Sequence, residues 1–177
     1  MISNGMAGRI SAQLNRELYS AYVYLGLSAQ AETMNLKGIA AWFMAKHNEE
    51  LVHAMKMYRY LIDQGATITL AQIAAPPDDA GAVLTMFERT LSHEREVTAA
   101  INDLVDQTLS EKDHATQIFL QWFVTEQIEE EATLNDILGR LRLFGDQGQG
   151  LLMIDNELAA LAKLMAQGAA AQSTAGP

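Results

Sequence analysis

The chain has 177 residues, enough for one domain with a sizeable core, and 49% of them are hydrophobic. The formal net charge of −10 argues against a nucleic-acid partner and favours cations, and the lack of cysteine excludes disulfides, thiolate sites and iron–sulfur clusters. No signal peptide and no apolar run of the ~20 residues that a membrane span requires is visible, so we expect a cytoplasmic protein with no membrane partner.

Apolar periodicity predicts four long helices and a shorter fifth one, and the abundance of alanine, leucine, methionine and glutamate favours helix over sheet. Asn35 is the expected N-cap of the second helix, and Gly65 stands where that helix should end. The predicted helices cover about 3–33, 35–65, 82–109, 114–144 and 151–165 of a single domain (1–177) with flexible tails at about 1–3 and 168–177.

The segment 65–82 decides the predicted topology. It is much longer than an antiparallel connection needs, whereas the turns after the first and third helices are short. Eighteen extended residues can span ~60 Å, more than the ~42 Å length of a helix of ~28 residues. The third helix can therefore start parallel to the second, with Ile68, Leu70 and Ile73 as apolar anchors of the link. The predicted fold class is all-α, an up-down four-helix bundle with one long crossover and a short fifth helix.

Each of the four long helices carries a glutamate in its apolar row, about halfway along its length. These glutamates are Glu17, Glu50, Glu94 and Glu130, and His53 follows Glu50 by one turn on the same face. Carboxylates that converge in an apolar interior repel one another and are poorly solvated. Two divalent ions would balance the four charges, and bridging carboxylates with one imidazole suit iron or manganese. The pattern predicts a dinuclear metal centre.

Taken singly, each of these signals has a simpler interpretation. One E-x-x-H pair on a helix is a weak indication of a metal site, and the acidic run at 126–131 on its own is more often a solvated surface. We expect His47, His93 and His114 to be surface or polar-network residues and not ligands. The metal interpretation rests on the coincidence of buried acids across four helices, which a solvated face does not predict.

Four stretches resemble the bacterial non-haem ferritins, and the likeness extends over nearly the whole chain. They are "LNRELYSAYVYLGLSA" (14–29), "HNEELVHAMKMYRYL" (47–61), "FLQWFVTEQIEEE" (119–131) and "GDQGQGLLMID" (145–155). The fourth helix has Gln127 and Glu130 where bacterioferritins carry a second E-x-x-H, and Leu51 stands where they carry a haem-ligating methionine. The resemblance therefore implies a ferritin that passes iron to a mineral and binds no haem.

The resemblance also implies roles for single residues. Glu17, Glu50 and His53 would bind one iron, and Glu50 would bridge to a second iron held by Glu94 and Glu130. Gln127 would lie beside the ligands or on the oxygen-facing side, and Tyr24 would donate an electron or hydrogen-bond a ligand. An extra iron site would be formed by Glu49, Glu126, Glu129 and Glu130.

The implied function is iron storage with ferroxidase activity. Fe(II) would be oxidised by O2 or H2O2 and stored as a ferric mineral inside a homo-oligomeric cage of twenty-four subunits, with the short last helix around the four-fold axis. Two other functions stay open. A rubrerythrin-like di-iron peroxidase or oxidase would need a second histidine ligand or a rubredoxin-type domain with four cysteine ligands, and a non-enzymatic scaffold bundle would turn its acids to solvent. A DNA-protecting mini-ferritin fits less well, because its ligands lie across a dimer interface.

Overall fold

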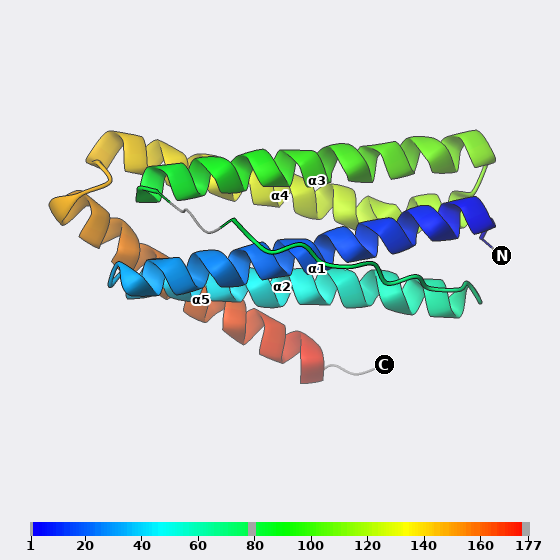
Figure 1. Cartoon of the computed structure of the whole chain (residues 1–177), viewed down its shortest axis with the longest axis horizontal. Helices are drawn as coiled ribbons and strands as arrows, with labels where there is room; N and C mark the ends of the chain where they lie inside the picture. The colour runs from blue at the N-terminus through cyan, green and yellow to red at the C-terminus, as the bar shows by residue number, and fades with distance from the viewer. Residues whose placement is uncertain (1, 78–80, 175–177) are drawn as a thin grey trace.

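The computed structural model describes residues 2–77 and 81–174, and within them it forms five helices and no strand. The helices are α1 (Asn4–Thr33), α2 (Lys37–Asp63), α3 (Val83–Glu111), α4 (His114–Phe144) and α5 (Gly148–Thr174), the last with side chains described as far as residue 168. The first four lie alongside one another, and α5 folds back across α2 from the far end of the bundle (Figure 1). The predicted all-α bundle with an additional C-terminal helix is confirmed.

Some residues of both predicted tails belong to the described part of the chain. Ile2 packs against the core and Ser3 caps α1, since its hydroxyl accepts from the backbone N–H of Met6 at 3.0 Å. The fifth helix extends beyond the predicted range 151–165 at both of its ends, and residues 175–177 of the predicted tail lie outside the described residues. No helix in the described part of the chain is both long and apolar enough to span a bilayer.

The long link between α2 and α3 runs back along α1, so that α2 and α3 point in the same direction, as the sequence predicts (Figure 1). Two of its three predicted apolar anchors are wrong. Ile68 packs against the core, but Leu70 is 65% exposed and Ile73 is 39% exposed.

Hydrogen bonds with Asn15 hold the link against α1 instead of these two apolar side chains. The Asn15 side-chain amide donates to the carbonyl of Thr69 at 3.0 Å, and its Oδ1 accepts from the backbone N–H of Ala71 at 2.8 Å. An extended link leaves its backbone N–H and C=O groups without partners of their own, and a single asparagine can satisfy one of each.

The start of α2 is capped by another helix and not by its own sequence. The prediction that Asn35 is the N-cap is wrong, because Asn35 lies in the turn with a φ of 59° and Leu36, the N-cap residue, offers no side-chain bond. The backbone N–H of Ile39 instead donates to Oδ1 of Asp155 in α5, at 2.9 Å. Gly38 permits this approach, since a Cβ there would lie 1.7 Å from the carbonyl oxygen of Asp155.

Two apolar clusters form the core, and a layer of polar residues lies between them. Trp42, Phe43 and Phe87 lie in one cluster with ring centroids 5.1 to 5.4 Å apart, and Met57 and Phe123 lie in the other. Among the described residues no Cα of α2 comes within 8 Å of a Cα of α4, so these helices meet only through side chains. The buried residues of the polar layer are Glu17, Lys46, Glu50, His53, Glu94, Gln127 and Glu130.

We expect Asp155→Ala to lower the free energy of unfolding by about 1 kcal/mol, because it removes the acceptor that caps α2. Urea unfolding followed by circular dichroism measures the change. Asn156→Ala is the matched control, since Asn156 is the exposed neighbour on the same helix. Equal unfolding midpoints for the two variants would contradict the capping role.

Candidate metal centre

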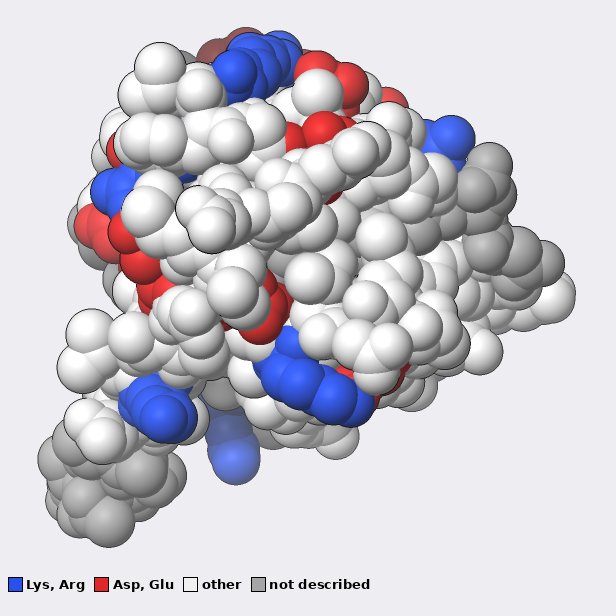
Figure 2. All heavy atoms as spheres, turned by 90° about the vertical axis from the view of Figure 1, so that its left-hand side faces the viewer, with Lys and Arg blue, Asp and Glu red and all other residues white. Residues whose placement is uncertain are grey.

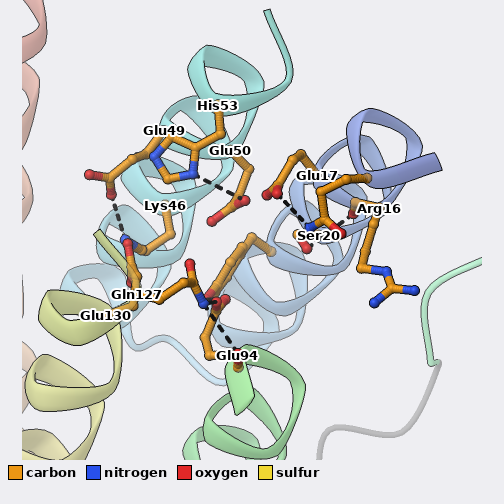
Figure 3. A network of polar contacts seen from close by, with 12 residues as sticks. Arg16, Glu17, Ser20, Lys46, Glu49, Glu50, His53, Glu94, Gln127 and Glu130 are labelled. Carbon is orange, nitrogen blue, oxygen red and sulfur yellow. Dashed lines mark hydrogen bonds and ion pairs between the residues drawn. The ribbon is translucent and has the colours of Figure 1, made fainter. Parts of the chain in front are cut away.

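Helices α1 and α2 contribute a compact group of three metal-binding side chains. Glu17, Glu50 and His53 each offer a ligand atom, and these atoms lie within 4.8 Å of one another. Nδ1 of His53 is 3.6 Å from Oε2 of Glu50, because residues three apart share a helix face (Figure 3). Gln13 donates to Oε1 of Glu17 at 2.8 Å, which orients that carboxylate without adding charge.

Helix α3 contributes Glu94, whose carboxylate is held by two neutral donors. The Tyr24 hydroxyl donates to Oε1 at 2.5 Å, and the Gln127 amide donates to Oε2 at 3.2 Å. The same amide also reaches Oγ1 of Thr98 at 3.2 Å. Tyr24 and Gln127 therefore both lie beside Glu94, and each donates a hydrogen bond to its carboxylate.

A buried lysine, which the sequence analysis missed, joins α2 to α4. The ammonium of Lys46 donates to Oε2 of Glu49 at 2.5 Å and also forms an ion pair with Glu130. Only 4% of Lys46 is exposed. Its spacing could have revealed it, because it falls in a row of buried residues three or four positions apart. That row is Phe43, Lys46, Glu50, His53 and Met57.

A second group of possible ligands lies next to the first and shares His53 with it. Glu49, His53 and Glu126 offer atoms within 4.8 Å of one another. Of the four glutamates expected at the extra iron site, the structure thus brings Glu49 and Glu126 together, while Glu130 pairs with Lys46. Glu129 is exposed and outside the group, because successive helical residues point about 100° apart and Glu130 faces inward.

Burial sets the protonation of the central acids. Burial raises the pKa of Glu17 well above its usual value, and the nearby charge of Glu50 raises it further. Burial and then the charge of Glu94 raise the pKa of Glu50, against the opposing effect of Lys46. Burial raises the pKa of Glu130 to about 7, although Lys46 again opposes the shift. These carboxyls therefore hold protons more tightly than ordinary glutamates do, and a metal ion would compete with those protons.

The other histidines lie outside both groups of possible ligands. Nδ1 of His47 is 2.7 Å from the carbonyl oxygen of Ala21, and Nε2 of His93 is 2.8 Å from the Ser20 hydroxyl. His114, the first residue of α4, is exposed. Each of these positions agrees with the polar-network or surface role that the sequence suggests.

The fold and the buried acids together define a class, the four-helix bundles with carboxylates from every helix at one level. A family model described as a ferritin-like domain matches residues 8–144. The bacterial non-heme ferritin of Campylobacter jejuni is 36% identical over 155 residues, which cover 88% of this chain and 93% of the relative. The bacterial non-heme ferritin of Bacteroides fragilis (strain 638R) is 37% identical over 158 residues, which cover 89% of this chain and 98% of the relative.

A solved structure, a novel open pore ferritin from Archaeoglobus fulgidus, superposes with a TM-score of 0.88 at 41% identity. The match covers 90% of this chain and 98% of that one. The chain belongs to the ferritin family, and the resemblance found in the sequence is confirmed.

The raised pKa values predict how the metal-free chain responds to pH. An ordinary glutamate titrates near 4.5 and Glu130 near 7, so over this range the folded state holds more protons than the unfolded chain. The stability from these groups is complete below the unfolded pKa and is lost as the pH rises through the folded pKa. We expect the melting temperature of chelator-treated protein to fall between about pH 5 and about pH 8.

Glu17→Gln should reduce that fall, because its amide cannot ionise, whereas Glu96→Gln, which changes an exposed acid on α3, should not. Differential scanning calorimetry at several pH values measures the melting temperatures of both variants. An undiminished fall in Glu17→Gln would show that Glu17 does not contribute to it.

Proposed function

We propose that this chain is an iron-storage protein that oxidises Fe(II) at the polar layer of its bundle and deposits Fe(III) inside an oligomeric cage. One observation carries the proposal, namely that acids from all four long helices are buried at one level beside a histidine. Glu17, Glu50, Glu94 and Glu130 are each between 1% and 5% exposed. Membership of the ferritin family supports the same conclusion.

The positions of the side chains suggest how two Fe(II) ions would bind as substrate. Glu17, Glu50 and His53 would hold the first ion, since their ligand atoms already lie within 4.8 Å of one another. Glu94 and Glu130 would hold the second. The charge of Glu94 contributes to the raised pKa of Glu50, which supports a role for Glu50 as the ligand shared by both ions. Carboxylates suit this chemistry because their hard oxygen atoms stabilise the ferric product.

The electrons and protons balance with either oxidant. Each Fe(II) gives one electron, so two ions with two protons reduce O2 to H2O2, or reduce H2O2 to two waters. Because the pKa values of Glu17 and Glu130 are raised, iron binding would release the protons that these carboxyls hold. Tyr24 stays protonated, since burial and the charges of Glu94, Glu130 and Glu50 raise its pKa, and it keeps donating to Glu94. Whether it also gives an electron stays a prediction.

Exposed apolar residues support assembly into the proposed twenty-four-subunit cage. A soluble chain seldom leaves an apolar stripe of this length uncovered. The outer face of α2 carries such a stripe, formed by Met44, Leu51, Met55, Tyr58 and Ile62. The end where α4 passes into α5 is also largely uncharged, with acidic and basic groups scattered over it (Figure 2). The exposed apolar residues there are Leu143, Phe144, Leu152 and Met153.

The alternatives fit the site less well. A scaffold bundle would turn its acids to solvent, whereas the four central glutamates are buried. A rubrerythrin-like oxidase would take a second histidine from α4, which offers Gln127 and Glu130 to the polar layer instead. The extra iron site, for which Glu49 and Glu126 are placed together with His53, and the cytoplasmic location stay predictions.

We expect Glu50→Ala and His53→Ala each to slow Fe(II) oxidation about ten-fold or more, because each removes a ligand of the first ion. Stopped-flow absorbance of the ferric product gives the rates, and size-exclusion chromatography checks that the oligomer persists. His114→Ala, at an exposed histidine, is the control. Oxidation at the wild-type rate in both variants would refute the site.

Leu152→Asp together with Leu164→Asp should weaken the oligomer, because these side chains are 60% and 64% exposed in the single chain and need a partner surface. Analytical ultracentrifugation should show smaller species than an assembly of twenty-four 19.4 kDa chains. Gln167→Asp adds a charge at an exposed polar position of the same helix and should leave assembly intact. A full-size, equally heat-stable double variant would show that α5 does not join subunits.

A further inference from the structure

Lys46 is the only lysine or arginine that is buried among the described residues, and its ammonium lies between two acids of the candidate metal centre. It contacts Oε1 of Glu130 on α4 and Oε2 of Glu49 one turn along α2. In Figure 3 these three side chains form one side of the polar layer, apart from Glu17. A positive charge thus already occupies the carboxylate that the second metal ion requires.

The two proposed metal positions differ in whether a positively charged side chain already contacts one of their carboxylates. Glu17, in the first position, is held by the neutral amide of Gln13, so a metal ion displaces no ionic partner of Glu17. At the second position, Glu94 has neutral donors but Glu130 has the ammonium of Lys46. A divalent ion bound by Glu130 would either displace the ammonium from Oε1 or bind the other oxygen of the same carboxylate, and in both cases the two cations would repel each other across that carboxylate.

Building on the proposed function, we infer that Lys46 is a tethered cation that competes with the second metal ion for Glu130, so that the two positions fill in order. The position of Glu17, Glu50 and His53 fills first. Glu94 and Glu130 bind the second ion once the ammonium has left Glu130. The lysine side chain is long and flexible, and it can remain attached to Glu49, whose side chain is 33% exposed at the edge of the layer.

Calorimetric titration of Co(II) into the assembled, metal-free protein tests this inference without the oxidation reaction. Wild-type protein should bind one ion per subunit tightly and a second more weakly. Lys46→Met should strengthen the second binding step about ten-fold or more and leave the first nearly unchanged, because it removes the competing charge. Lys46→Arg keeps the charge and should resemble wild type.

Lys37→Met is the matched control, since it removes the same charge from an exposed position at the start of α2. If the affinity of Lys37→Met for the second Co(II) ion rises as much as that of Lys46→Met, the cause is net charge and not local competition, and the inference fails. If Lys46→Met does not assemble, Lys46→Gln replaces it, because its amide can donate to Glu130 without a charge. Lys46→Gln should strengthen the second Co(II) binding step as Lys46→Met does.

An unchanged or weaker second step in the assembled Lys46 variant would overturn the inference while leaving the proposed function intact. The proposed function fails separately if Glu50→Ala and His53→Ala leave both Co(II) steps unchanged. Absence of both steps in wild-type protein would overturn the proposed function and the inference together.

Discussion

The burial of four carboxylates at one level of a helical bundle is the constraint on which the rest of this structure depends. Removing a carboxylate from water without a partner is strongly unfavourable, and the central glutamates are nearly inaccessible. In the metal-free chain three kinds of compensation act together. The buried acids hold protons more tightly than ordinary glutamates do, Tyr24, Gln127 and Gln13 donate hydrogen bonds, and Lys46 supplies a positive charge. Protons and an ammonium are replaceable by metal ions, so under the proposed function this compensation would leave the centre ready to bind them.

The bundle tolerates this layer because apolar clusters pack on both sides of it. The cluster around Trp42 and Phe87 and the cluster around Met57 and Phe123 hold the helices together, while α2 and α4 stay too far apart for backbone contact at any level. Polar side chains bridge that separation at the layer itself. The apolar clusters thus stabilise the bundle on either side of the candidate site. Their packing offsets the local destabilisation that the buried acids cause.

Helix α5 stabilises the helix that carries most of the site. Its Asp155 caps the first turn of α2, and the close contact at Gly38 leaves no space for another side chain there. Later turns of the same helix carry Lys46, Glu50 and His53. The contact therefore links the end of the bundle that carries exposed apolar residues to the helix that positions the candidate ligands.

The sequence by itself determined the helices, the crossover and the set of central acids. Helical periodicity and glutamates at mid-length depend only on spacing along the chain, so Glu17, Glu50, Glu94 and Glu130 could be named before any contact was known. The family could be recognised for the same reason, since its motifs are continuous stretches such as 47–61.

Tertiary structure decided which partners these groups meet. The cap of α2 comes from α5 and not from Asn35, because Asp155 is more than a hundred residues away along the chain. The link is held by Asn15 where Leu70 and Ile73 were expected to pack. Lys46 lay in the apolar row of α2, but its role depends on Glu130, on a helix that α2 reaches only through side chains. Spacing places a side chain on a face of its helix, and only the packing of helices decides what that face meets.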